Sequence, residues 1–224
     1  MADIGSWRGP EDDQVLQEAS RLLAAGALVA CPTETFYALA VDAGNEQALH
    51  RLLAVKGRPR SKPLLVLVAD RSMLTTIVAS IPPLAHQLMN HFWPGPLTLI
   101  LPARPELPFP LTAGSGTVGV RQPGLTLTRR LVQIFGKPIT GTSANLSGQE
   151  PFREGQQLNR ALGADIDLII QDGPCPGGLP STIVDVCHEP LRLIRPGAIS
   201  ATALAQALGR PLAANEGDEP VRLA

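Results

Sequence analysis

Proline and glycine divide this chain into short apolar segments. The 224 residues include 22 prolines and 21 glycines, and neither residue is well tolerated inside a regular helix or a central strand. No apolar run between them reaches the length of about 20 residues that a membrane-spanning helix needs. The chain is therefore expected to fold from many short elements joined by tight, specific turns.

The apolar runs alternate irregularly between strand-like and helix-like patterns. Strands are expected at 27–31, 64–69, 97–101, 117–121, 138–142, 168–171, 182–186 and 191–195. Helices are expected at 15–23, 46–56, 82–93, 125–135, 154–162 and 201–208, the first stopped by Gly26 and the second capped by Asn45 and ended by Gly57. Some strands follow one another directly, which favours a mixed α/β (α+β) fold over a purely doubly wound one: a twisted mixed sheet, parallel and antiparallel, with flanking helices.

Composition indicates an ordinary globular domain. Hydrophobic residues make up 44% and charged residues 17% of the chain, which supports a sizeable core. No repeat or linker divides the sequence, so we expect one domain over residues 1–210 and a loose C-terminal tail over residues 211–224. Three cysteines without close spacing disfavour a disulfide framework or a zinc site, and the N-terminus carries no secretory pattern. A reducing, cytoplasmic location is therefore expected.

The overall charge argues against a protein held mainly by nucleic-acid phosphates. The formal net charge is -1, and aromatic residues, on which bases stack, are only 4% of the chain. Any anion-binding site must therefore be a local one.

The densest local charge lies in the segment 56–63, with the sequence KGRPRSKP. Its four cations within seven residues would, in most chains, indicate a solvated basic turn. Here prolines restrict the backbone, and the segment joins an expected helix to an expected buried strand. A rigid cationic loop in this position is typical of phosphate or carboxylate binding.

Two further segments have the composition of ligand-binding loops. Residues 141–148, GTSANLSG, offer hydroxyls and backbone N–H groups to a phosphate, although a plain Asx or Ser turn has the same composition. Residues 114–119, GSGTVG, match the dinucleotide pattern only formally, because a strand and not a helix is expected to follow. That strand ends at Arg121, and a buried arginine there requires an acid or an anionic ligand.

Several common catalytic motifs are absent from the sequence. It contains no phosphate-binding G-x-x-x-x-G-K-[ST], no H-E-x-x-H and no G-x-S-x-G pattern. Ser143 and Ser181 have no base nearby in the sequence, so we expect ligand contacts from them and no covalent catalysis. The carboxylates available to a metal are not singled out by spacing: Glu34, Asp42, Asp172 and Asp185.

Seven short segments occur in the same order as in the YrdC/TsaC-like family of threonylcarbamoyl-AMP synthases, which the chain resembles over about residues 27–197. They are 32–35 with Tyr37, 56–59 with 62–64, 94–98, 120–123 in part, 143–148, 181–182 and 195–197. Each segment alone is a weak signal, whereas the ordered set is specific. The chain resembles the short form of the family, without an additional C-terminal domain.

The resemblance implies a YrdC-like fold, with the sheet wrapped around a deep basic cavity, and an enzyme of the nucleotidyltransferase type. Such an enzyme forms threonylcarbamoyl-AMP and pyrophosphate from L-threonine, bicarbonate or CO2, and ATP, for threonylcarbamoyladenosine modification of tRNA. It would use Mg²⁺ with ATP and deliver its product to transferase proteins. Weak binding of tRNA or other double-stranded RNA is implied as well, and no membrane contact.

The resemblance also assigns site residues. Around L-threonine it places Thr33, Gly141, Ser181 and, facing the carboxylate, Arg121. Around ATP it places Arg58, Lys62, Thr117, Ser143, Asn145 and Arg195. The resemblance implies no residue that forms a covalent intermediate. It implies instead that Lys56 and Arg58 stabilise the charge that develops during the reaction, and it leaves the metal ligands unassigned.

The sequence departs from the family pattern at three positions. Leu67 stands where many members carry a histidine near threonine, Ala38 where glycine is common, and Pro151 where some members have a hydroxyl. Two alternatives stay open at this point. One is an RNA-binding protein of this family without the activity, and the other, motivated by Leu67, is a related adenylating enzyme that uses another amine.

Overall fold

The computed structural model describes residues 1–9 and 11–210, so the tail expected at 211–224 lies outside the described residues. The helices are α1 (Gln14–Ala24), α2 (Glu46–Lys56), the 3-10 helix η1 (Arg71–Thr76), α3 (Pro83–Phe92), α4 (Phe109–Thr112), α5 (Thr126–Phe135), α6 (Gly155–Leu162) and α7 (Ala201–Leu208). The strands are β1 (Asp3–Ser6), β2 (Val29–Cys31), β3 (Ala38–Ala40), β4 (Leu65–Leu67), β5 (Leu97–Pro102), β6 (Thr117–Arg121), β7 (Ile139–Thr140), β8 (Thr142–Ser143), β9 (Leu168–Gln171), β10 (Thr182–Asp185) and β11 (Arg192–Arg195).

The described strands form two mixed sheets. One has five strands in the order β1-β9-β2-β3-β8, and the other has six in the order β11-β10-β5-β6-β4-β7. Each contains parallel and antiparallel pairs, for example β2 parallel to β9 but antiparallel to β3. The mixed α/β class expected from the sequence is confirmed, while the division into two sheets was not anticipated.

Most elements form where the sequence pattern places them. Asn45 caps α2 by accepting a hydrogen bond from the backbone N–H of Ala48 at 3.1 Å, and Gly57 ends the helix in the left-handed region at φ 57°. That ending turns the chain into the cationic segment before β4 begins. Helix α7 has the same design, with Ser200 as its cap and Gly209 after it.

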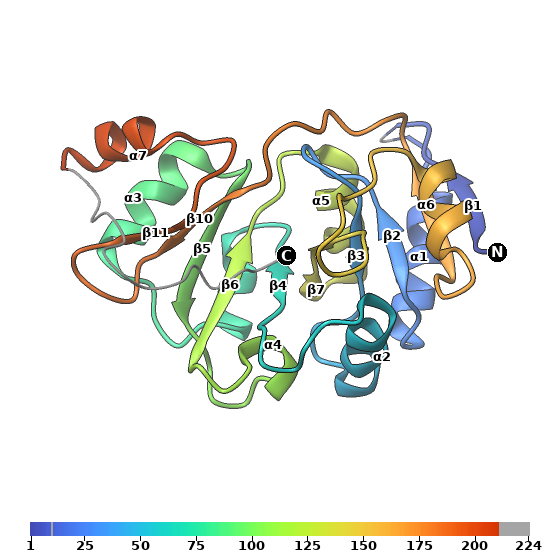
Figure 1. Ribbon diagram of the computed structural model, residues 1–224, viewed down its shortest axis with the longest axis horizontal. Coiled ribbons are helices and arrows are strands. Elements are labelled where there is room, and N and C mark those ends of the chain that lie inside the picture. Colours follow the sequence, from blue (N-terminus) through green and yellow to red (C-terminus); the bar gives the residue numbers. More distant parts are fainter. Residues whose placement is uncertain (10, 211–224) are drawn as a thin grey trace.

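Each sheet carries its own helices. Helices α1 and α5 pack on each other beside the five-stranded sheet, whereas α3 and α7 pack together on the six-stranded sheet. Helix α1 lies toward one end of the molecule, α3 and α7 lie at the other end, and α5 lies near the middle (Figure 1). An ion pair at 2.6 Å between Asp13 and Arg130 ties the start of α1 to α5. None of the described helices combines the length and apolarity required for a membrane span.

The chain passes from one sheet to the other at Gly141. The sequence predicted one strand over 138–142, but β7 pairs with β4 in one sheet and β8 pairs with β3 in the other. Gly141 lies between them and donates its N–H to the carbonyl of Leu65 at 2.8 Å. This crossing brings the edges of both sheets together and leaves a cavity between them.

Candidate functional site

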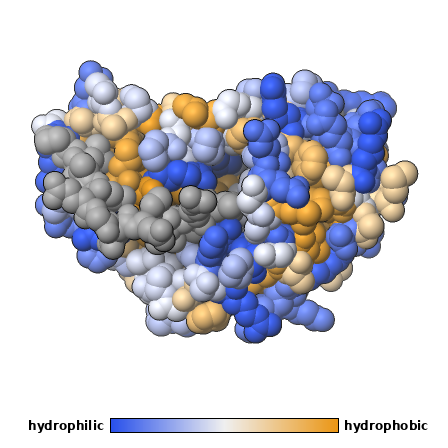
Figure 2. Space-filling model, in the orientation of Figure 1, coloured by the Kyte–Doolittle hydropathy of each residue, from blue (hydrophilic) through white to orange (hydrophobic). Residues whose placement is uncertain are grey.

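A cavity of about 520 Å³ lies between the two sheets. The five-stranded sheet contributes the segment before β3 and strand β8, and the six-stranded sheet contributes the ends of β6 and β11. Eight of the residues expected in the site line it: Thr33, Arg58, Arg121, Gly141, Ser143, Asn145, Ser181 and Arg195. On the face shown in Figure 2, hydrophobic residues are visible in separate patches, and strongly hydrophilic residues lie near the middle as well as at the margins.

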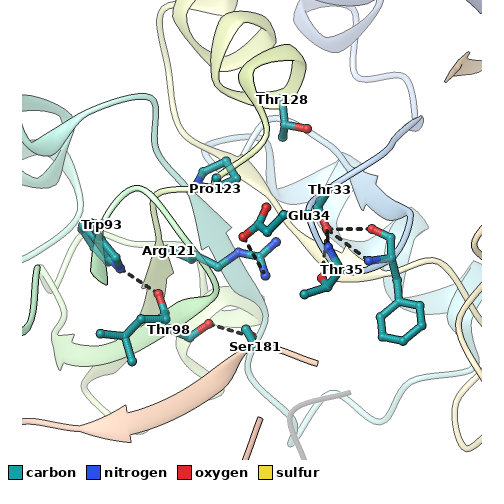
Figure 3. Close-up of polar contacts among 12 residues, drawn as sticks. Thr33, Glu34, Thr35, Trp93, Thr98, Arg121, Pro123, Thr128 and Ser181 are labelled. Atoms are coloured by element: carbon teal, nitrogen blue, oxygen red, sulfur yellow. Dashed lines mark hydrogen bonds and ion pairs between the residues drawn. The ribbon is translucent and has the colours of Figure 1, made fainter. Parts of the chain in front are cut away.

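The turn after β2 is built by a threonine hydroxyl. Thr33 Oγ1 donates to the carbonyl of Phe36 at 2.7 Å and lies 3.2 Å and 3.3 Å from the N–H groups of Thr35 and Phe36 (Figure 3). Thr33 and Thr35 both line the cavity, and both are buried. The turn therefore presents two hydroxyl side chains to the cavity in a rigid arrangement.

The side chain of Arg58 packs against the cationic segment to which Arg58 itself belongs. Its Nε and Nη2 donate to the carbonyls of Lys62 at 3.3 Å and Pro63 at 2.9 Å, and its side chain lines the cavity. The residue is 5% exposed, and this burial lowers the pKa of its guanidinium to about 10. Arg58 therefore stays charged at neutral pH and is held in place before any anion arrives.

Lys56 lies beneath the cavity wall. Its ammonium donates to the carbonyls of Ser143 and Asn145 and to Asn145 Oδ1, at 2.5, 2.9 and 3.0 Å. Asn145 in turn donates to the carbonyl of Gln149 at 2.6 Å. Lys56 is 1% exposed and does not line the cavity, so it supports the loop that does.

Ser181 and Arg195 form a second rigid corner. Arg195 donates to the carbonyl of Ser181 at 2.8 Å and to its Oγ at 3.0 Å, and that Oγ lies 3.0 Å from Thr98 Oγ1. Burial and, secondly, the charge of Arg121 lower the pKa of Arg195 to about 10. The corner thus combines a charged guanidinium with a hydroxyl at the cavity wall.

Gly141 leaves no room for a side chain. A Cβ there would lie 2.4 to 2.8 Å from the Cγ and both Cδ atoms of Leu67. Leu67 is fully buried and pairs in register with Arg121 of β6. Leu67 therefore lies behind the cavity wall, and the backbone of Gly141 forms the surface in front of it.

Arg121 faces an acid that the sequence did not single out. Its Nη1 lies 3.8 Å from Oε1 of Glu34, whose side chain extends from the turn after β2 (Figure 3). The Arg121 side chain is 4% exposed and that of Glu34 is 19% exposed. The expectation that a buried arginine here would need an acid or an anion is met by this acid.

Three of the expected residues do not reach the cavity wall. Besides Lys56, these are Lys62 and Thr117. Thr117 is the first residue of β6, and its Oγ1 lies 2.9 Å from Ser115 Oγ. A strand rises about 3.3 Å per residue, so Thr117 is about 13 Å from Arg121 at the other end of β6. Lys62 is half-buried in the turn closed by its N–H and the carbonyl of Pro59. The ligand contacts expected of these residues stay predictions.

The cavity also contains residues that sequence reasoning missed. Arg153 and Glu150 line it from the loop after β8. The N–H of Tyr37 donates to the carbonyl of Phe152 at 3.0 Å, which brings this loop against the turn after β2. No local pattern marks Arg153, because its position depends on pairing between segments more than 100 residues apart.

The arrangement is suited to binding and polarising anions. Four arginines line the cavity with hydroxyls beside them: Arg58, Arg121, Arg153 and Arg195. Over residues 1–9 and 11–210, no three histidine, cysteine or acidic side chains gather in a way that could hold a metal ion. The three cysteines are free, and burial raises the pKa of the Cys31 thiol to about 12, so it is a poor nucleophile.

The chain matches one protein-family model over residues 21–197: the Sua5/YciO/YrdC model, described as "Telomere recombination". Threonylcarbamoyl-AMP synthase of Bacillus subtilis is 37% identical over 218 residues, which is 97% of this chain and 62% of that protein. The protein of the same name from Pyrococcus abyssi is 35% identical over 93% of this chain and 62% of its own length. The chain thus spans about three fifths of the length of these relatives.

A solved structure extends the comparison. The crystal structure of Pyrococcus abyssi Sua5 complexed with L-threonine has a TM-score of 0.89 and 32% sequence identity to this chain, and the match covers 95% of this chain and 62% of that one. The arrangement of strands and helices is therefore shared through nearly the whole of the described protein.

Proposed function

Because the chain belongs to the Sua5/YciO/YrdC family, we propose that it forms threonylcarbamoyl-AMP and pyrophosphate from L-threonine, bicarbonate or CO2, and ATP. The observation that carries the proposal is the cavity between the sheets, lined by arginines and hydroxyls. The names of the similar proteins favour a synthase over an RNA-binding protein without activity. The activity would be a nucleotidyl transfer in the cytoplasm, with the product consumed by tRNA-modifying transferase proteins.

The two substrates would contact different sets of the lining residues. Thr33, Gly141 and Ser181 would contact the amino acid, and Arg121 would bind its carboxylate; all four line the cavity. Arg58, Ser143 and Arg195, which line the same cavity, would hold the nucleotide and its phosphates. The volume of about 520 Å³ lies within the range of sites for ligands of this size.

The reaction depends on positioning and charge. The amine of threonine attacks CO2 with loss of a proton to solvent, or bicarbonate with loss of water, to give a carbamate. A carbamate oxygen then attacks the α-phosphorus of ATP as pyrophosphate leaves. Arg58 and Arg195 would neutralise the charge that develops on the phosphates. Holding the reactants together would add to the rate enhancement without a covalent intermediate, and the cavity between the sheets would shield the carbamate from water.

Mg²⁺ would enter with ATP. Among the described residues there is no cluster of acids, histidines or cysteines that could hold it alone. The phosphates of ATP would supply ligands to the ion, and the ion would reduce the negative charge that the arginines must neutralise.

Pyrophosphate release tests this proposal. Purified protein with Mg·ATP and bicarbonate is expected to release pyrophosphate with L-threonine, and at least tenfold more slowly with L-serine, L-alanine or no amino acid. Arg58→Ala is expected to reduce the rate about 10²-fold or more, the scale of losing one charge-stabilising donor.

The control is Arg60→Ala in the same loop. Arg60 is exposed and does not line the cavity, so its removal is expected to change the rate less than twofold. Equal losses in the two variants would mean that only the net charge of the loop matters. Pyrophosphate release that depends on another amine, and not on threonine, would contradict the assignment of threonine as the substrate.

A further inference from the structure

Glu34 differs from the residues on either side of it. Thr33 and Thr35 line the cavity, whereas Glu34 does not. Both of its carboxylate oxygens are inaccessible to solvent and accept no hydrogen bond among the described residues. Gly124 lies against its carboxyl group, since a Cβ on Gly124 would be 3.4 Å from Glu34 Cδ. The side chain of Glu34 therefore lies behind the cavity wall and not in the cavity.

The group that this acid faces is the guanidinium of Arg121. The distance of 3.8 Å between Arg121 Nη1 and Glu34 Oε1 is within range for an ion pair but too long for a hydrogen bond. Arg121 Nε is also buried without a hydrogen-bond partner among the described residues. Glu34 therefore offsets the charge of Arg121 without accepting a hydrogen bond from it, while the Arg121 side chain also lines the cavity (Figure 3).

This pairing matters because the cavity must distinguish the carboxylate of the amino acid from the phosphates of ATP. An arginine without a nearby acid attracts phosphate at least as strongly as carboxylate. Arg121 lies close enough to Arg195 for its charge to lower the pKa of Arg195, so phosphate bound near one could also occupy the other. A buried acid behind Arg121 repels a phosphate dianion more than a carboxylate, and it attracts the ammonium of a zwitterion.

We propose that Glu34 is a positioning and specificity residue. It holds the Arg121 guanidinium toward the cavity and makes this subsite electrically neutral, so that it takes a zwitterionic amino acid and excludes phosphate. The inference rests on the proposed function, in which Arg121 binds the threonine carboxylate. It adds that one buried acid keeps the amino-acid subsite free of the triphosphate.

Calorimetry on the full chain tests the inference. L-threonine is titrated into the wild type, Glu34→Gln and Glu34→Asp, with and without inorganic phosphate, and ATP is titrated separately. Glu34→Gln is expected to weaken threonine binding about tenfold and to make phosphate compete with threonine at concentrations at least tenfold lower than in the wild type. Glu34→Asp keeps the charge but shortens its reach, so it is expected to weaken threonine binding while still excluding phosphate.

Two controls separate this role from a structural one. Glu106→Gln removes the acid of an exposed pair, 3.4 Å from Arg104, and is expected to change neither ligand's affinity by more than twofold. Loss of fold would weaken ATP binding together with threonine binding, whereas new competition by phosphate requires an altered subsite. Should Glu34→Gln fail to fold, Glu34→Asp decides, through weaker threonine binding at unchanged ATP affinity.

The outcomes also separate the two proposals. Threonine affinity and phosphate competition that stay unchanged in Glu34→Gln would overturn the inference, even if the wild type makes pyrophosphate. A wild type that binds threonine with the expected dependence on Glu34, but releases no pyrophosphate, would overturn the proposed function alone. A wild type that does not bind threonine would overturn both.

Discussion

The lysine of the cationic segment shows how a single residue departs from its expected role. Lys56 was expected to stabilise charge on the reacting phosphates, but its ammonium lies under the loop at Ser143 and Asn145. Three oxygen acceptors require all three N–H donors of the charged form. Burial opposes that form and, with the charge of Arg58 second, lowers the pKa of Lys56 to about 7.

Lys56 should make the stability of the protein depend on pH. Its pKa in the folded state is about 7, below its ordinary value of 10.5, so between these values the unfolded chain binds a proton that the folded chain does not. Stability from this group therefore rises with pH in that window. Relative to Lys56→Met, the wild type is expected to gain about 2 kcal/mol of unfolding free energy from pH 7 to pH 9.

Urea denaturation at both pH values checks this expectation. The exposed Lys137, whose side chain is 66% exposed, serves as the matched control, and Lys137→Met should follow the wild type. Parallel pH slopes in the wild type and Lys56→Met would show that Lys56 keeps an ordinary pKa in the folded protein.

Among the elements, helix α2 sets where the cationic loop begins. Its cap, Asn45, satisfies the N–H of Ala48, and Gly57 ends the helix just before Arg58. Asn45→Ala is expected to lower the unfolding free energy by about 1 kcal/mol, the usual cost of losing a cap. Chemical denaturation measures the change.

The residue before another helix provides the comparison. Glu154 stands at the cap position of α6 but makes no capping hydrogen bond, so Glu154→Ala is expected to change the unfolding free energy by less than about 0.5 kcal/mol. If both variants lose the same stability, the capping hydrogen bond of Asn45 contributes nothing of its own.

At the scale of the whole molecule, a ligand in the cavity would connect the two sheets. Ser143 of β8 in the five-stranded sheet and Arg195 of β11 in the six-stranded sheet both line the cavity. A ligand that binds only the folded state at 100 times its dissociation constant adds about 2.7 kcal/mol. Mg·ATP at such a concentration is expected to raise the thermal midpoint by about 5–10 °C in a single transition.

Differential scanning calorimetry measures the midpoint in the wild type and in Arg58→Ala at the same Mg·ATP concentration. The variant should show a clearly smaller rise, because one phosphate-binding side chain is gone. An equal rise in both proteins would place ATP outside the cavity, and two separate transitions would mean that the sheets unfold independently.

The predicted elements were most accurate where local chemistry decides. The helix expected at 201–208 is α7, and the strand expected at 168–171 is β9, since caps and apolar periodicity act within a few residues. Strand β1 was missed because its residues, DIGS, have little strand propensity and become a strand only by pairing with β9. Strand β3, three residues long, likewise exists through its pairing with β2 and β8.

By itself the sequence determined the class of the fold and the rigid cationic segment, and with the family resemblance it identified eight of the residues that line the cavity. Only the tertiary structure decided that there are two sheets, that Lys56 points under the loop, and that Glu34 is the acid behind Arg121. Caps, prolines and apolar runs act on residues that are close to them in the chain. Their effects can therefore be predicted from the sequence. The contacts of Lys56 join residues 87 and 89 positions apart, and such contacts depend on how strands from distant segments pair.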